Sequence, residues 1–70
     1  MKVVFNGQPI ELAESCTLKT LLSDDNVTKG VPLEQAVVAV NQNFVHRETY
    51  DEVVISEGDE VEMLTAVVGG

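Results

Sequence analysis

The chain is poor in the residues that form disulfides, metal sites and membrane anchors. It has one cysteine, one histidine, no tryptophan and four basic residues. A single cysteine cannot form an intrachain disulfide, and an unpaired thiol is typical of a reducing compartment. The longest uninterrupted apolar run, residues 36–40, is far shorter than the about 20 residues that a membrane helix needs. The N-terminus has no basic segment followed by an apolar one, so we expect a cytoplasmic protein without a membrane partner.

Acidic residues outnumber basic ones by twelve to four, which gives a formal net charge of −8. This charge repels the phosphates of nucleic acids and the anionic surfaces of membranes, so neither is an expected partner. A macromolecular partner is expected to present a basic docking surface instead. The alternative is that the charge only keeps a small protein soluble, and both explanations can hold together.

Motifs for catalysis, metal binding and nucleotide binding are also missing. The sequence contains no phosphate-binding glycine loop, no CxxC or HExxH spacing, and residues 57–62 lack the ligand pattern of a calcium loop. Activation of Cys16 would need a neighbouring base, and the only histidine is distant in sequence, so we expect a buried or half-buried structural cysteine at a helix entrance. His46 lacks companions at ligand spacing and is expected in a surface turn. We therefore expect no bound cofactor, no metal and no intrinsic catalytic residue.

The N-terminal segment predicts a β-hairpin. Asn6 and Gly7 supply the two positive-φ positions of a type I′ turn between strands at residues 2–5 and 8–12. Both faces of the first strand are apolar, which places it in the middle of a sheet. Pro9 has no backbone donor, which places the second strand at an edge.

A short helix is predicted after the hairpin. The hydroxyl of Thr17 can cap its first turn, and the leucines at positions 18, 21 and 22 share one face. Residues 23–26 are expected to end this helix. The segment from 26 to 33 shows no clear period and is predicted to be a loop, and a single helical turn that begins near Pro32 is an option.

The second half of the sequence predicts further strands. Residues 37–40 are apolar on both faces and turn into residues 44–45. The stretch 46–52 is polar apart from Tyr50 and is expected to be a surface turn, and residues 53–55 a short connection or strand. Residues 60–64 alternate between polar and apolar, as a half-buried final strand does. These elements add up to an α+β domain in which one small sheet packs on one main helix.

The last six residues are the most informative segment. They have no evident strand partner and end in Gly69 and Gly70. A carboxylate carried on two residues without a Cβ can enter a channel too narrow for any other residue. Six extended residues reach roughly 20 Å, which would place that carboxylate in a partner's active site while the body docks outside. We therefore predict a domain at residues 1–64 and a flexible C-terminal tail at residues 65–70.

The simplest alternative for this tail is a frayed terminus. Against it, Ala66, Val67 and Val68 are apolar, which is unusual for an idle, solvated end. An α-carboxylate is ionised at neutral pH and is a poor acyl donor, so another protein has to activate it, most simply by adenylation. The chain would then be a carrier and not itself an enzyme.

Six segments, in their order and spacing, are similar to those of one known family. They are residues 3–7, 17–22, 39–41, 44–50, 57–62 and 69–70. Together they resemble the ThiS family of thiamin-biosynthesis sulfur carriers, within the ubiquitin-like β-grasp superfamily. The resemblance covers nearly the whole chain and implies a small mixed sheet of four or five strands around the helix, with the first and last strands parallel in its middle.

The resemblance also implies a chemistry for the last residues. A ThiF-like adenylyltransferase would activate the carboxylate of Gly70 with ATP, and a cysteine desulfurase would supply the sulfur that converts it to a thiocarboxylate. Thiazole synthase, ThiG, would then take that sulfur into the thiazole ring of thiamin. Gly70 would be the adenylated and sulfur-carrying residue, and the segment that enters both partners would be Gly69, Val68, Val67 and Ala66.

Three alternatives stay open at this point. The small subunit of molybdopterin synthase shares the fold and the Gly-Gly ending but often has prolines just before it, and residues 65–68 contain none. This difference favours the thiamin branch. A ubiquitin-like protein modifier that forms isopeptide bonds would have the same kind of tail. A noncovalent β-grasp module that pairs through a sheet edge would not need the carboxylate, and fold alone does not choose among these functions.

Overall fold

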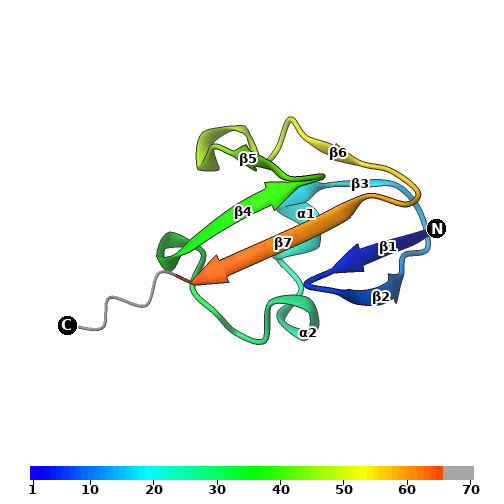
Figure 1. Cartoon of the computed structure of the whole chain (residues 1–70), viewed down its shortest axis with the longest axis horizontal. Helices are drawn as coiled ribbons and strands as arrows, with labels where there is room; N and C mark the ends of the chain where they lie inside the picture. The colour runs from blue at the N-terminus through cyan, green and yellow to red at the C-terminus, as the bar shows by residue number, and fades with distance from the viewer. Residues whose placement is uncertain (66–70) are drawn as a thin grey trace.

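A mixed five-stranded sheet forms the body of the chain, for which the computed structural model describes residues 1–65 (Figure 1). β1 and β7 are parallel neighbours inside this sheet, and every other neighbouring pair is antiparallel. The strand order is β2-β1-β7-β4-β5. The strands are β1 (Lys2–Phe5), β2 (Gln8–Glu11), β4 (Ala36–Val40), β5 (Asn43–Val45) and β7 (Glu60–Thr65). The sheet has the number of strands and the parallel pair that the resemblance implies.

The predicted hairpin is confirmed. Asn6 has φ of 50° and Gly7 has φ of 81°, which are the signs that a type I′ turn requires. β1 lies between β2 and β7, while β2, which contains Pro9, lies at the edge of the sheet. The sequence therefore predicted both the turn and the positions of these two strands.

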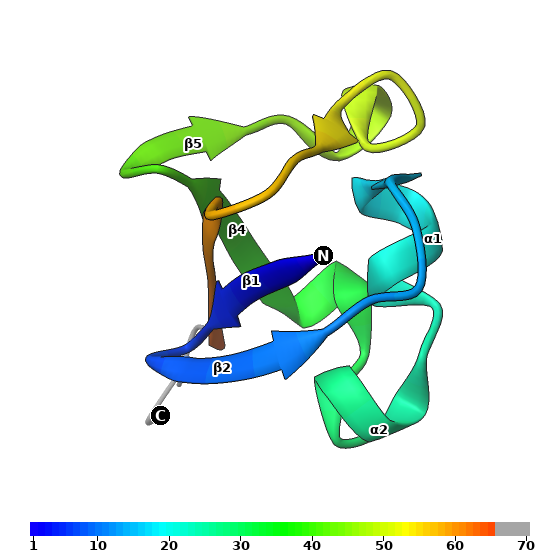
Figure 2. The ribbon, with the colours of Figure 1, turned by 90° about the vertical axis from the view of Figure 1, so that its right-hand side faces the viewer.

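Helices cover one face of the sheet, as Figure 2 shows. α1 (Leu18–Leu22) begins where the Thr17 hydroxyl oxygen accepts a hydrogen bond from the backbone N–H of Thr20 at 3.2 Å. Its three leucines are all buried against the sheet. Both the cap and the apolar stripe are those predicted.

The prediction of an uninterrupted loop between residues 26 and 33 is wrong. α2 (Asp25–Thr28) forms there, and the Asp24 carboxylate accepts a hydrogen bond from the N–H of Asn26 at 2.9 Å. Lys29, at φ of 60°, ends the helix. A helix of four residues shows too little periodicity to be detected from the sequence, and only its cap could have indicated it.

Four short elements complete the fold of residues 1–65. β3 (Cys16–Thr17) pairs antiparallel with β6 (Val54–Ile55) in a second, two-stranded sheet, of which the sequence analysis anticipated only the later strand. Single 3₁₀ turns form at η1 (Leu33–Gln35) and η2 (Arg47–Thr49). Pro32 stands one residue before η1 rather than inside it.

The core lies between the sheet and the helix layer. Its fully buried members are Val3, Leu18, Val38, Ile55 and Val61. Tyr50 is also buried, at 5% exposure, although it follows the surface turn η2 directly. The surface turn predicted at residues 46–52 is therefore present, and Tyr50, the one apolar residue of that stretch, packs into the core.

β7 continues through Thr65, which pairs with Ala36 of β4. The strand thus ends one residue beyond the domain boundary that the sequence predicts. The expected carrier and channel residues Ala66, Val67, Val68, Gly69 and Gly70 lie outside the described residues. Of the helices formed by residues 1–65, none has the length and apolar character needed to cross a bilayer.

Candidate functional site

β7, the strand that leads to the last five residues, is held on both sides as far as Met63 and on the β4 side up to its end. On the β4 side its register runs from Val40 opposite Val61 to Ala36 opposite Thr65. On the β1 side the side chain of Asn6 continues the ladder where β1 has stopped. Its Oδ1 accepts from the N–H of Met63 at 2.8 Å, and its Nδ2 donates to the Met63 carbonyl at 3.3 Å. The end of β7, after which residues 66–70 follow in the sequence, is therefore fixed in position.

Beside the end of β7, apolar side chains gather on the face of the sheet opposite the helices. Successive residues of a strand point to opposite faces, so Leu64 lies outside while Met63 is buried. Leu64 is opposite Val37, and Phe44 is opposite Ala39. Phe44 is 73% exposed, Leu64 55% and Val37 44%. We call Val37, Ala39, Phe44 and Leu64 the outer patch.

Charges of opposite sign flank the outer patch. On β7, Glu62 is opposite Ala39 and, like Glu60 before it, is exposed. On the other flank, where β5 ends, His46 and Arg47 are exposed and line a hollow together with Val37. The outer patch thus has acidic side chains on its β7 side. On its β5 side it has the positively charged Arg47, at η2.

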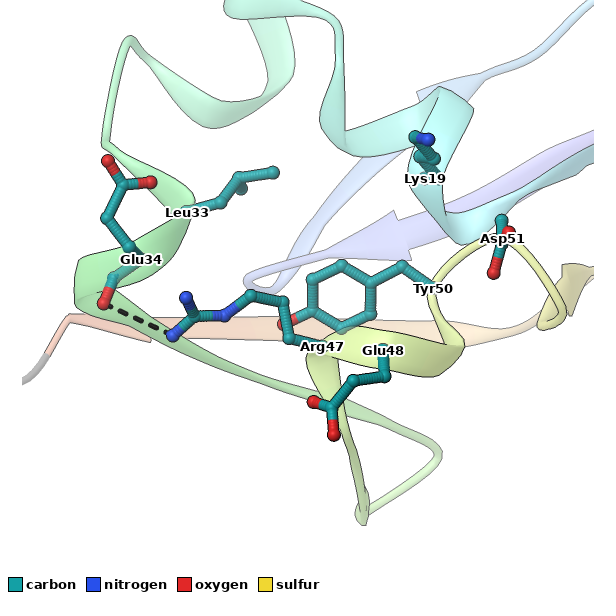
Figure 3. A pocket seen from close by; sticks show the side chains of 7 residues that line it. All are labelled: Lys19, Leu33, Glu34, Arg47, Glu48, Tyr50 and Asp51. Carbon is teal, nitrogen blue, oxygen red and sulfur yellow. Dashed lines mark hydrogen bonds between the residues drawn. The ribbon is translucent and has the colours of Figure 1, made fainter.

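Arg47 separates two hollows. The hollow drawn in Figure 3 is about 360 Å³ in volume and lies between α1, η1 and η2. It is lined by Lys19, Leu33, Glu34, Arg47, Glu48, Tyr50 and Asp51. The other is about 310 Å³ and borders the outer patch, and it is lined by Ala36, Val37, Val45, His46, Arg47, Glu48 and Tyr50.

The Arg47 guanidinium is bound only loosely. Its Nη2 donates one long hydrogen bond of 3.4 Å to the backbone carbonyl of Glu34, the dashed line in Figure 3. No carboxylate among residues 1–65 forms an ion pair with Arg47, although several acidic residues lie nearby. Its donors therefore remain available to a ligand that approaches through either hollow.

Tyr50 forms a wall shared by the two hollows. Burial raises the pKa of its phenol above the usual 10.0, and the positive charge of Arg47 opposes this shift. The phenol is therefore protonated at neutral pH and able to donate a hydrogen bond. Its backbone carbonyl accepts from the N–H of Lys19 at 2.9 Å, which ties this wall to α1.

The structure places the other candidates of the sequence analysis in structural positions. Cys16 is half-buried in β3, opposite Ile55. His46 is exposed in the turn before η2, as predicted. Among residues 1–65, no three His, Cys, Asp or Glu side chains come close enough together to hold a metal ion. The outer patch and Arg47 were not predicted from the sequence, although the alternation of β7 already placed Leu64 on the same face as Glu60 and Glu62.

Sequence comparisons give matches over the whole length of the chain. The family model described as the ThiS family matches residues 3–70. The chain is 30% identical to the sulfur carrier protein ThiS of Escherichia coli, with all of both chains covered. It is also 30% identical to part of a thiazole synthase from Paramagnetospirillum magneticum, of which it spans 20% of the length.

Structural comparisons also give thiamine biosynthesis proteins. The crystal structure of a thiamine biosynthesis protein (ThiS) from Geobacter metallireducens matches with a TM-score of 0.83 and 33% identity, and all of both chains is covered. The solution structure of a thiamine biosynthesis protein from the same organism matches with a TM-score of 0.74 over 88% of its length. The five-stranded sheet and its helix therefore form a ubiquitin-like β-grasp fold.

Proposed function

The chain belongs to the ThiS family, and from this premise we propose that it is a sulfur carrier of thiamin biosynthesis whose sulfur is bound at the α-carboxyl group of Gly70. The observation that supports this most directly is the match of the family model, which runs to Gly70 itself. The match along the full length of a sulfur carrier protein adds to it. In this proposal the chain is a co-substrate of other enzymes and contributes no catalytic group.

The first step makes the carboxyl carbon electrophilic. The carboxylate of Gly70 is ionised at neutral pH, so its carbon is a poor electrophile and neither oxygen can leave without activation. A ThiF-like adenylyltransferase joins one carboxylate oxygen to the α-phosphorus of ATP and releases pyrophosphate. The resulting acyl adenylate has AMP as its leaving group. ATP is bound by that enzyme and not by this chain.

The second step exchanges oxygen for sulfur. The outer sulfur of a persulfide formed by a cysteine desulfurase attacks the carbonyl carbon of Gly70, and AMP departs with the carboxylate oxygen that was adenylated. A second thiol then attacks the S–S bond of the resulting acyl disulfide, releases the sulfur on Gly70 and forms a new disulfide, so this thiol supplies the two electrons. The product is a thiocarboxylate, whose sulfur is a nucleophile. Enclosure of this group in a partner's channel would limit its hydrolysis, and the absence of a Cβ at Gly69 and Gly70 suits such a channel.

The acceptor in this proposal is a thiazole synthase, ThiG. The support is the similarity of the whole chain to one fifth of a protein named thiazole synthase. A carrier-like segment and a synthase in one polypeptide would meet at high effective concentration. As a separate chain, the carrier would need a docking surface of its own, and the outer patch next to the end of β7 is the exposed surface best placed for it.

The proposal is tested by following the mass of the chain. Incubation with ATP, a ThiF-like adenylyltransferase, a cysteine desulfurase and cysteine should give the increment of one oxygen-for-sulfur exchange, located at Gly70 by fragmentation. Deletion of Gly70 should abolish it. The Cys16→Ala variant is the matched control, because it removes the only other sulfur acceptor and should retain the increment. Sulfur found on Cys16 alone would contradict the proposal.

The pathway is tested separately by complementation. The chain should restore thiamin-independent growth to a strain that lacks its own ThiS, and deletion of Gly70 should prevent this. Rescue of only a strain that lacks the small subunit of molybdopterin synthase would assign the sulfur to the other pathway. A ladder of conjugates on immunoblots, dependent on Gly70, would identify a protein modifier.

A further inference from the structure

We propose that Asn6 is a site of spontaneous deamidation, and that its conversion to aspartate or isoaspartate releases β7 from the hold on its β1 side. The evidence is the pair Asn6-Gly7 in an exposed turn, together with the long-range contact of the Asn6 side chain with Met63. This modification goes beyond the proposed function, because it needs only the atoms of this chain and water. It acts on the strand from which residues 66–70 continue in the sequence.

Two hairpin turns of the fold share one design. The turn at residues 6–7 has φ of 50° and 81°, and the turn at residues 41–42 has φ of 51° and 71°. Each begins with an asparagine whose side chain bonds to the backbone of β7. Asn41 Oδ1 accepts from the N–H of Glu60 at 3.0 Å, where the strand begins, and the Asn6 side chain does the same nearer its end. The two asparagines therefore hold two different parts of β7.

The two turns differ in the residue that follows the asparagine. Gly7 has no side chain, so its backbone nitrogen is open to attack on the side-chain carbonyl carbon of Asn6. The side chain of Gln42 hinders the corresponding nitrogen in the other turn. Of the asparagines, at positions 6, 26, 41 and 43, only Asn6 precedes a glycine. We therefore expect conversion at Asn6 and not at Asn41.

The reaction consumes water and releases ammonia. The backbone nitrogen of Gly7 loses its proton and forms a bond to Cγ of Asn6, while the Cγ–Nδ2 bond breaks and the departing nitrogen takes up that proton as ammonia. A cyclic succinimide remains. Water opens this ring at Cγ to give aspartate, or at the main-chain carbonyl carbon to give isoaspartate. In isoaspartate the main chain passes through the former side chain and is longer by a methylene group.

The fold slows this reaction without excluding it. Asn6 Oδ1 accepts from the N–H of Met63 at 2.8 Å and Nδ2 donates to the Met63 carbonyl at 3.3 Å, so the amide is directed at β7 and not at the nitrogen of Gly7. Asn6 and Gly7 are both exposed, so water and base reach the turn. Attack therefore requires a local opening that breaks the two hydrogen bonds to Met63, and such an opening costs less than global unfolding.

Conversion weakens the hold on β7. An aspartate at position 6 still accepts from the N–H of Met63, but its ionised carboxylate has no hydrogen to donate, so an oxygen would face the Met63 carbonyl oxygen. Isoaspartate also lengthens the turn, which disturbs the register of Phe5 with Gln8. Both products loosen the strand that leads to the last five residues. Adenylation of Gly70 should then be slower, a consequence that rests on the proposed function.

The first test exchanges the residues that follow the two asparagines, in the full-length chain. Each chain is aged at mildly alkaline pH, in buffer and in urea, and peptide mapping by mass spectrometry measures the acid formed from each asparagine. Gly7→Gln should slow conversion at Asn6 about tenfold or more, and Gln42→Gly should start conversion at Asn41. Because the rates in urea do not depend on the fold, the exchange of residues is interpretable there even for a destabilised variant.

The same experiment shows whether the fold slows the reaction. The wild-type rate at Asn6 should be about tenfold or more higher in urea than in buffer, because urea removes the hydrogen bonds to Met63. Equal rates in buffer and urea would overturn the inference. So would equal conversion at Asn6 and Asn41 in the wild-type chain, or conversion at Asn6 in urea alone.

The second test measures what conversion does to β7. Asn6→Asp should lower the equilibrium constant of folding about fivefold to tenfold, because one hydrogen bond to Met63 is replaced by repulsion. Asn26→Asp is the matched control, since it adds the same charge to the exposed first turn of α2 and should change the constant less than about twofold. In the isoaspartate form of the aged chain, amide hydrogen exchange at Met63 should be about fivefold faster. Equal stability of the two variants, or unchanged exchange at Met63, would overturn the inference.

The effect on the carrier is measured last, by ATP–pyrophosphate exchange with the ThiF-like adenylyltransferase. The kcat/KM for Asn6→Asp should fall about threefold relative to Asn26→Asp. An equal kcat/KM for the two variants would overturn the predicted effect on adenylation. Absence of exchange with the wild-type chain would instead overturn the proposed function, because deamidation and stability are measured without that enzyme.

Discussion

The chain has two phenylalanines, and they lie on opposite faces of the five-stranded sheet. Phe5 lies in β1 with its side chain toward the helices and is 6% exposed, whereas Phe44 lies in β5 on the other face of the same sheet and is 73% exposed. The same apolar side chain stabilises the fold on one face and is left in water on the other. A small protein that leaves such area uncovered gains no stability from it, which indicates that the outer face serves contact with another molecule.

The largest effect is expected on the inner face. Phe5→Ala should lower the free energy of unfolding by about 3–5 kcal/mol, because it removes buried apolar area and leaves a cavity. A domain of this size has a total of roughly 4–10 kcal/mol, so the variant should be close to unfolding at room temperature. Urea denaturation followed by circular dichroism measures the change. A loss below about 1 kcal/mol would break the contrast between the two faces.

The second-largest loss of stability is expected near the end of β7. Asn6→Ala should cost about 2 kcal/mol, because it removes both hydrogen bonds to Met63 and places a side chain that disfavours positive φ at 50°. Asn6→Gly is the matched control, since glycine accepts that φ and only the hydrogen bonds are lost. The same denaturation experiment should place the glycine variant between the alanine variant and the wild type. Equal stability of all three would show that Asn6 does not hold the strand.

On the outer face, a substitution should change stability little and the KM for the carrier strongly. Phe44→Ala should leave the free energy of unfolding within about 0.5 kcal/mol of the wild type, because the side chain is already in water. The same variant should raise the KM for the carrier about tenfold in ATP–pyrophosphate exchange. Stability and exchange measured on one preparation check both halves. A large loss of stability, or an unchanged KM, would remove the distinction between the faces.

The smallest expected effect is a shift in the pKa of Tyr50, which lies at the boundary between these regions. Tyr50 is the only tyrosine and the chain has no tryptophan, so phenolate absorbance reports on this residue alone. Its pKa should lie above 10.0 because burial disfavours the anion, and Arg47→Met should raise it further because a favourable positive charge is lost. A normal pKa in the folded chain would show that Tyr50 is exposed.

The sign of the linked stability follows from this raised pKa. The folded chain holds the phenol proton more tightly than the unfolded chain does. The stabilisation is therefore fully present below pH 10.0 and is lost as the pH rises from there through the folded-state pKa. Tyr50→Phe should remove this part of the alkaline loss, although it also changes the wall of the hollows.

The sequence predicted the elements whose signals are local and strong. The Asn6-Gly7 turn, the edge position of Pro9 and the Thr17 cap each rest on the chemistry of one or two residues, and all three are confirmed. α2 and β3 were missed because four and two residues are too few for a periodic pattern. Tyr50 is buried by packing in the core, which the polar residues next to it in the sequence do not indicate.

The candidate site also has a part that local sequence signals predict and a part that depends on the fold. The expectation that Gly70 carries the sulfur came from the end of the sequence and a family resemblance, and it stays a prediction. The outer patch could not be predicted as a surface, because it needs the register that sets Val37 beside Leu64 and Ala39 beside Phe44. The position of Arg47 next to that patch depends on β5 being shorter than β4, which only the folded chain reveals.

The central claim is that the reactive atom of this chain is the carboxyl carbon of Gly70, and one measurement tests it most directly. Fragmentation mass spectrometry of the product formed with ATP, the adenylyltransferase, the desulfurase and cysteine should find one sulfur in place of one oxygen, in the fragment that ends at Gly70. An unchanged mass with enzymes that modify another ThiS family member under the same conditions would contradict the account.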